Sequence, residues 1–180
     1  MKKRSEVEIK DTWKLEDMVA SDSRWEQLFE EASSKVKQYA DYKGRLDESA
    51  DTLYACLKFD DEISRETELL YVYSRMRSDQ DTADQKYQDM FSRAQSLSYK
   101  ASEYSSYIVP ETLSMPEEKL DAYMKADNGI SHFKRALEMV LNKREHTLSG
   151  EMEELLAQSY DATQGASQIF TMFNNADVKF

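Results

Sequence analysis

The sequence is poor in residues that interrupt helices and in residues that commonly bind metals. Its 180 residues include four glycines, two prolines, two histidines and one cysteine. Because glycine and proline disfavour a helix interior, their scarcity favours long helices and an all-α protein. The single cysteine, Cys56, excludes an intramolecular disulfide and any zinc site built on several cysteines. We therefore expect an all-α protein suited to a reducing cytoplasm.

Long apolar runs and an excess of positive charge are missing too. The longest apolar run, residues 69–73, is far shorter than the ~20 residues of a membrane helix. Residues 2–4 carry basic side chains, but no apolar stretch of an export signal follows them. The net charge is −11, and the basic residues are dispersed among acidic ones, so the surface should repel phosphate backbones. We expect neither a membrane nor a nucleic acid as partner.

Apolar residues recur at helical spacing through the first 110 positions. One apolar stripe, from Trp25 to Tyr39, follows a helix start at Asp22 or Ser23, where Glu26 could complete a capping box with Ser23. A second pattern begins near Ser49 and passes through, or restarts at, position 60 before it ends near position 78. A third begins at Asp81 or Thr82 and should stop at Pro110. The short connection between the last two predicts a long antiparallel helical hairpin.

Shorter patterns fill the remaining positions. Ser114 followed by Pro116 predicts a helix start, and the run 127–129 (Asp-Asn-Gly) should end that helix. Further helices are expected over 130–142, from Ser149, and around 169–173, which gives six or seven in an antiparallel bundle. Residues 174–180 have a turn followed by a strand-like alternation. We expect a single helical domain over residues 1–180.

The residues that could carry chemistry fit structural roles better. His132 and His146 lack the HExxH pattern that supplies zinc ligands and a general base, and they are too far apart to share a helical turn. Cys56 falls on an apolar row, where a buried thiol is expected. Two acidic groups resemble metal sites in composition, and we interpret them as helix caps (Asp79, Asp81, Asp84) and as a solvated helix face (Asp60, Asp61, Glu62, Glu66).

Tyrosine is frequent, with eleven copies. Six of them fall on the predicted hairpin: Tyr71, Tyr73, Tyr87, Tyr99, Tyr104 and Tyr107. One interpretation is a groove for an extended peptide, because tyrosine combines an apolar ring with a hydroxyl group. Packing between helices is the interpretation that we favour.

Five segments, in the same order along the chain, resemble the N-terminal portion of the oligoendopeptidase F family of zinc metallopeptidases. They are WKLEDMVASDSRWEQLFEE (13–31), LLYVYSRMRSDQDTAD (69–84), IVPETLSMPEEKL (108–120), KREHTLSGEMEELLA (143–157) and NNADVKF (174–180). The resemblance implies a helical half that faces a catalytic half across a deep channel, which limits substrates to unfolded oligopeptides. It also implies that the zinc ion, its ligands and the general base belong to the later half. No residue of this chain is therefore expected to be catalytic, metal-binding or cofactor-binding.

The resulting expectation is a non-catalytic N-terminal domain of an oligopeptide-cleaving zinc peptidase, which contacts oligopeptides together with the catalytic domain. A free-standing helical interaction module is the alternative. The sequence also predicts a weak homodimer that strengthens with salt and weakens when residues 174–180 are deleted, because Val178 and Phe180 lie in an apolar tail.

Overall fold

The computed structural model describes residues 7–126 and 128–174, and within them the chain is all-α with no strand. Residues 175–180, where the sequence predicts a strand-like start, lie outside the described part, as does Asp127. The described residues contain seven α-helices in chain order: α1 Asp22–Lys35, α2 Ala50–Gln80, α3 Gln85–Ser105, α4 Ile108–Ser114, α5 Glu117–Met124, α6 Lys134–Asn142 and α7 Gly150–Met172. The predicted all-α class is confirmed.

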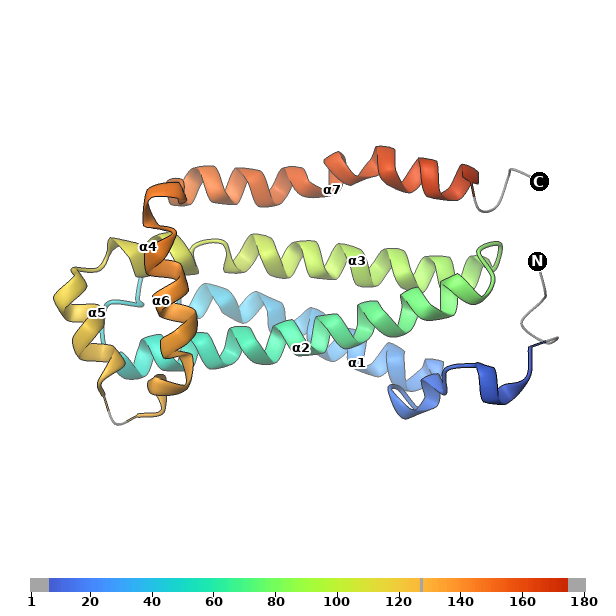
Figure 1. The fold of residues 1–180 in the computed structure, drawn as a ribbon, viewed down its shortest axis with the longest axis horizontal. Helices are drawn as coiled ribbons and strands as arrows, with labels where there is room; N and C mark the ends of the chain where they lie inside the picture. Colours follow the sequence, from blue (N-terminus) through green and yellow to red (C-terminus); the bar gives the residue numbers. More distant parts are fainter. Residues whose placement is uncertain (1–6, 127, 175–180) are drawn as a thin grey trace.

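The helices α2 and α3 form the predicted long antiparallel hairpin along the molecule (Figure 1). Helix α2 runs unbroken through position 60, and Ser49 caps it by accepting a hydrogen bond from the Thr52 amide at 3.0 Å. The predicted cap of α3 was wrong. Asp84 accepts from the Lys86 amide at 2.9 Å, whereas Asp81 adopts an extended conformation that ends α2.

Helix α1 packs against α2 with its apolar stripe buried. The stripe continues beyond the helix into a 3-10 turn, Val36–Asp41, and four of its members are in the core: Trp25, Ala32, Val36 and Tyr39. Ser21, not Ser23, caps α1 by accepting from the Arg24 amide at 3.2 Å. Glu26 does not close a capping box, because its carboxylate accepts two hydrogen bonds from Arg93 of α3 at 2.9 and 2.7 Å.

Neither proline has its predicted position: Pro110 does not stop α3, and Pro116 precedes α5 and is not in its first turn. Helix α3 ends at Ser105, and Pro110 lies in the first turn of α4, where an amide has no helical partner to lose. Ser114 belongs to the last turn of α4, and its hydroxyl donates to the Glu111 carbonyl at 2.7 Å. The residue that precedes α5 is Pro116, with no side-chain cap.

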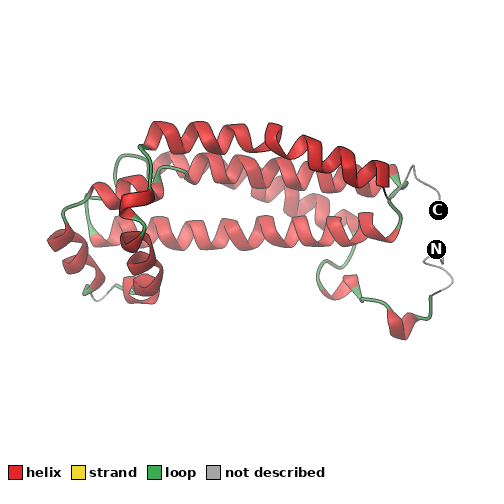
Figure 2. Cartoon of the chain, turned by 45° about the horizontal axis from the view of Figure 1, so that its top comes forward, coloured by secondary structure: helices red, strands yellow, loops and turns green. Residues whose placement is uncertain are grey.

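The short helices α4, α5 and α6 gather at one end of the long hairpin (Figures 1 and 2). Gly129 makes the turn between α5 and the 3-10 turn Ile130–Phe133, with φ of +90°. A Cβ atom at this position would also meet the Tyr54 ring at 3.0 Å, so only glycine fits. Helix α7 then runs along α3 as one continuous helix, where the sequence suggested two.

Among residues 7–126 and 128–174, no helix is both long and apolar enough to cross a membrane.

Candidate interaction surface

The two histidines lie apart and face solvent. His132 is in the 3-10 turn Ile130–Phe133, beside the Phe133 ring, and His146 ends the 3-10 turn Arg144–His146. Within the described part of the chain, no three His, Cys, Asp or Glu side chains lie close enough to hold a metal ion. This set of donors does not fit a zinc ion.

Cys56 is fully buried in the core, as the sequence predicted. Its sulfur lies 3.7 Å from the Tyr107 hydroxyl oxygen. Burial raises the pKa of the Cys56 thiol to about 12, so the thiolate needed for nucleophilic chemistry does not form at neutral pH.

The acidic residues of α2 (Asp60, Asp61, Glu62 and Glu66) do not form one solvated face. The interpretation was wrong for Asp60 and Glu66, which are partly buried. Asp60 accepts a hydrogen bond from the Tyr39 hydroxyl at 2.7 Å, and burial raises the pKa of its carboxyl group. Glu62 and Glu66 both accept from Lys35 of α1. These carboxylates therefore bind neighbouring helices one by one and do not converge on a metal position.

The other acidic group has structural roles, but of its three predicted helix caps only Asp84 caps a helix through its side chain. Asp81 and Asp84 accept hydrogen bonds from backbone amides in the turn between α2 and α3. Asp79 pairs instead with Arg75, with 3.1 Å between Nε and Oδ2.

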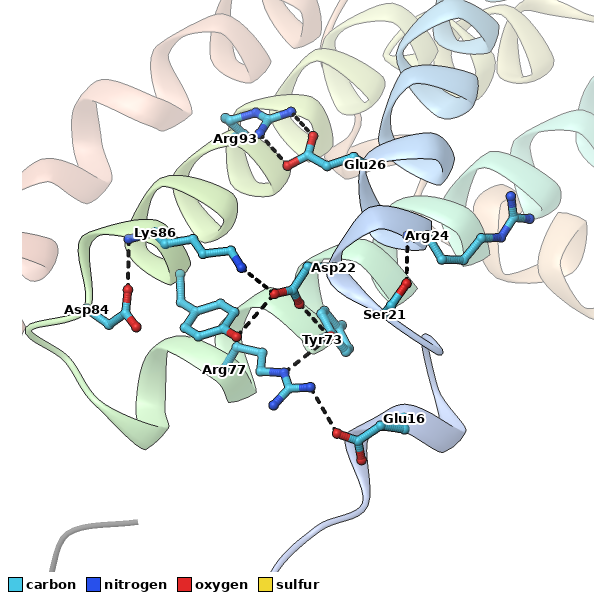
Figure 3. A network of polar contacts seen from close by, with 11 residues as sticks. Glu16, Ser21, Asp22, Arg24, Glu26, Tyr73, Arg77, Asp84, Lys86 and Arg93 are labelled. Atoms are coloured by element: carbon cyan, nitrogen blue, oxygen red, sulfur yellow. Dashed lines mark hydrogen bonds and ion pairs between the residues drawn. The ribbon is translucent and has the colours of Figure 1, made fainter. Parts of the chain in front are cut away.

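Asp22 is the centre of a polar network that joins three helices (Figure 3). Its carboxylate accepts hydrogen bonds from the Tyr73 hydroxyl at 2.8 Å, the Lys86 ammonium at 2.6 Å and the Tyr87 hydroxyl at 3.2 Å. Arg77 extends the network, because it donates to the Tyr73 hydroxyl and to Glu16 of the lead-in segment. The network therefore fixes α1 and the lead-in against the closed end of the hairpin.

The Asp22 network predicts a pH-dependent stability. Burial is the strongest influence and disfavours the ionised carboxylate, but the donors from Lys86, Tyr73 and Tyr87 together outweigh it and lower the pKa of Asp22. A carboxyl group with a lowered folded pKa stabilises the fold above its unfolded pKa of about 3.9, and this contribution is lost as the pH falls below that value.

Asp22→Asn should therefore cost about 1 to 3 kcal/mol at pH 7 and less at pH 3. Urea unfolding of both proteins at the two pH values measures the difference. The matched control is Asp17→Asn, since Asp17 pairs only with nearby Lys14 and is well exposed. A stability difference that is equal at both pH values would contradict the role of the ionised Asp22.

Helix α7 has the least covered surface of the long helices. None of its described side chains is buried, and α3 is its main neighbour. Beyond Glu154, the only charged residue up to position 173 is Asp161. Large apolar side chains stay exposed along the helix: Met152, Leu155, Leu156, Tyr160, Ile169, Phe170, Met172 and Phe173. The exposed surface of α7 is thus largely apolar and carries few charges.

Two grooves separate α7 from the rest of the bundle. The groove near the closed end of the hairpin has a volume of about 390 Å³, and Gln168 donates to Gln95 across it at 2.7 Å. The groove near α4 has a volume of about 640 Å³, and there the Tyr160 ring meets Tyr99 edge to face at 5.4 Å. Amide, hydroxyl and aromatic side chains line much of the first groove, and hydroxyl, aromatic and apolar side chains line much of the second. The amide and hydroxyl groups can bond to a peptide backbone.

The six tyrosines of the hairpin do not form one groove. Tyr73 and Tyr107 are buried, and Tyr71 packs against Phe91 with ring centroids 5.2 Å apart. These three tyrosines pack between helices, which is the interpretation that we favoured from the sequence. Tyr99 alone of the six lines the larger groove, beside α7.

Over the described residues, the fold defines the chain as an all-α domain with several exposed apolar side chains on α7. Comparison with known proteins gives a more specific assignment. The family described as Oligopeptidase F matches residues 111–180. Oligopeptidase PepF of Bacillus subtilis is 37% identical over 177 residues, which are 98% of this chain and 26% of that protein. The chromosomal oligoendopeptidase F of Lactococcus lactis subsp. cremoris is 32% identical over 182 residues, 30% of its length.

The fold also matches solved structures. The crystal structure of oligoendopeptidase-F from Enterococcus faecium matches 87% of this chain with a TM-score of 0.82 and 32% identity. The match covers 30% of that protein. The chain belongs to the oligoendopeptidase F family, in which it is an N-terminal domain. It spans only about a quarter to a third of the length of these relatives, and the resemblance seen in the sequence is confirmed.

Proposed function

We propose that this domain is the non-catalytic helical lobe of a cytoplasmic zinc metallopeptidase that cleaves oligopeptides. The observation that carries the proposal is that this chain matches, from end to end, about 30% of the length of proteins named oligoendopeptidase F. In this proposal the zinc ion, its ligands and the general base come from the family's remaining length, because the donors in the described residues do not fit zinc. The partners are oligopeptides and that catalytic part, with no role for nucleic acid or membrane.

The lobe would control which peptides reach the active site and would contribute no catalytic group. The long hairpin of α2 and α3 is braced by α1 through a buried stripe and the Asp22 network, so it is a rigid wall. The grooves beside α7 present amide and hydroxyl groups that can pair with an extended backbone. A narrow channel between this wall and the catalytic part would admit unfolded oligopeptides and exclude folded proteins.

The uncovered apolar face of α7 favours a second candidate function. A free-standing helical module could use such a face to bind a protein partner, since large exposed apolar patches mark interaction sites. This candidate needs no catalytic part.

A chimera separates the two candidates. The region of Bacillus subtilis oligopeptidase PepF that matches this chain would be replaced by residues 1–180, and cleavage of an internally quenched oligopeptide would be measured. We expect the chimera to retain activity within about tenfold of the parent, a loss of about 1.4 kcal/mol in transition-state stabilisation at most. The 180-residue chain alone, and the parent without the matched region, should cleave nothing.

Two controls make the result specific. A chimera that carries an unrelated helical bundle of similar size should be inactive, and a chelator should abolish the activity of the active chimera. Cleavage by the 180-residue chain alone would contradict the proposal. A folded but inactive chimera, with this chain still binding other proteins, would favour the interaction module.

A further inference from the structure

A groove between α1 and α3 is lined by basic side chains. It has a volume of about 410 Å³, and its walls come from α1, the 3-10 turn Val36–Asp41 and α3, which pack together. None of the described residues of α7 contributes to it. Lys37, Arg93 and Lys100 line the groove, and none of its described lining residues is acidic. On a chain of net charge −11, this groove is a local concentration of positive charge.

Two of the three cations are available to a ligand. Arg93 is already paired, because it donates to the Glu26 carboxylate at 2.9 and 2.7 Å (Figure 3) and lies 3.7 Å from Asp89. Lys37 and Lys100 are exposed, and neither forms a hydrogen bond or an ion pair within the described part of the chain. They come from the 3-10 turn and from α3, so their charges border the groove from two elements.

Hydroxyl groups in the groove favour the same kind of ligand. Ser33, Ser92 and Ser96 line it, and none of their hydroxyl groups forms a hydrogen bond within residues 7–126 and 128–174. A carboxylate only accepts hydrogen bonds, so it needs donors such as hydroxyl and ammonium groups. The remaining lining residues are apolar or aromatic: Phe29, Val36, Leu97 and Tyr104. A ligand that matches this lining has an anionic end beside an apolar side chain.

From this lining we infer that the groove binds the C-terminal residue of an oligopeptide. The α-carboxylate accepts hydrogen bonds from Lys37 and Lys100, and an apolar terminal side chain packs on Phe29 and Tyr104. A terminal residue carries its carboxylate and its side chain on one Cα atom, so it presents both to the groove. The volume of about 410 Å³ lies within the usual range of small-ligand sites, about 300 to 1,000 Å³.

The inference rests on the proposed function, because it takes oligopeptides as the ligand. Its consequence is a preference for peptides with a free C-terminus. The contacts are made by the non-catalytic lobe and are the same in the bound substrate and in the transition state, so they lower KM and leave kcat unchanged. Because the two lysines are exposed, binding is weak, with a dissociation constant of about 0.1 to 1 mM that rises with added salt.

Nuclear magnetic resonance titration of the 180-residue chain tests the site. The probes are the tripeptide acetyl-Gly-Ala-Phe with a free C-terminus and the same tripeptide amidated at that end. The free acid should shift the backbone amide signals of Ser96 and Lys100. The amidated tripeptide should bind about tenfold more weakly, because it lacks the carboxylate. Binding of the free acid should weaken as sodium chloride is added.

Substitution of the two lysines gives a matched comparison. Lys37→Gln combined with Lys100→Gln should raise the dissociation constant of the free acid by about tenfold. The control combines Lys58→Gln and Lys125→Gln, which change the net charge equally at two exposed lysines outside the groove. This control should leave the dissociation constant almost unchanged. Circular dichroism of both double variants checks that they are folded.

Several results would overturn the inference. They are equal binding of the free acid and the amidated tripeptide, no binding of the free acid at all, and an equal effect of the two lysine pairs. Inorganic phosphate is the competitor, and it should bind more weakly than the free acid because it has no side chain to pack on the aromatic rings. Phosphate that displaces the tripeptide at an equal or lower concentration would show that the groove holds any small anion.

The chimera keeps this test separate from the proposed function. If the chimera is inactive while the 180-residue chain binds the free acid selectively, the groove is supported and the proposed function fails. In an active chimera, Lys37→Gln with Lys100→Gln should raise KM for a substrate with a free C-terminus, and should not affect kcat or the amidated substrate. Equal losses with both substrates would show that the lysines contact another part of the family fold, and would overturn the inference.

Discussion

Trp25→Ala should lower the free energy of unfolding by about 3 to 5 kcal/mol, the usual cost of removing a buried aromatic side chain. The Trp25 side chain has 0% exposure and stacks on Phe29 with ring centroids 5.2 Å apart. Its indole N–H donates to the Leu70 carbonyl oxygen of α2 at 3.0 Å. The Arg93 guanidinium of α3 lies 5.3 Å from the ring centroid. One side chain thus connects α1 with both helices of the hairpin.

Two comparison variants separate these contributions. Trp25→Phe keeps an aromatic ring but leaves the buried Leu70 carbonyl without this donor, and it should cost about 1 to 3 kcal/mol. Trp13→Ala removes the other tryptophan, which is 79% exposed, and should change stability little. Urea unfolding followed by circular dichroism gives all three values. Equal midpoints for Trp25→Ala and Trp13→Ala would show that α1 is not anchored through this ring.

The helices could be predicted because the spacing of apolar residues within a short segment indicates which face of that segment is buried. The stripe from Trp25 to Tyr39 was correct even though its last part, beyond Lys35, is a 3-10 turn. Apolar residues three and four positions apart share a face in either geometry closely enough to stay in the core. The fold class and the long hairpin depend only on such repeated spacing and on the short connection between two patterns.

Helix ends were predicted less well because several residues near each end have the same chemistry. Asp81 and Asp84 can both cap a helix, and Ser21 and Ser23 can too. The choice depends on where the preceding helix ends, which the local sequence does not fix. Pro110 illustrates the same ambiguity, since proline suits both the residues after a helix and the first turn of the next one.

The local sequence could not predict which polar and apolar side chains are exposed. Asp60 is half-buried because Tyr39, 21 positions earlier, reaches it, and an acidic run gives no indication of that contact. The apolar pattern on α7 indicates an amphipathic helix, but it cannot show which of the described apolar side chains stay exposed. Burial depends on every other element that packs against the helix.

Leu70→Ala is expected to cost about 2 to 5 kcal/mol, through lost burial and the cavity that remains. Leu70 is 1% exposed on α2, and its backbone carbonyl accepts hydrogen bonds from both Trp25 and the Ser74 hydroxyl. The substitution retains that carbonyl but removes side-chain packing around it. Because Leu70 and Trp25 are in contact, their substitutions should combine non-additively in a double-mutant cycle.

Matched variants identify the cause of the loss. Leu70→Met nearly conserves volume and should cost less than about 1.5 kcal/mol. Leu155→Ala removes a leucine that is 58% exposed on α7, and at a concentration where the chain is monomeric it should leave the melting temperature almost unchanged. If Leu70→Ala and Leu155→Ala have the same melting temperature, the face of α2 that carries Leu70 does not pack against α1 and α3. A loss confined to Leu70→Ala, with additive behaviour toward Trp25→Ala, would instead show that the two side chains stabilise separate parts of the core.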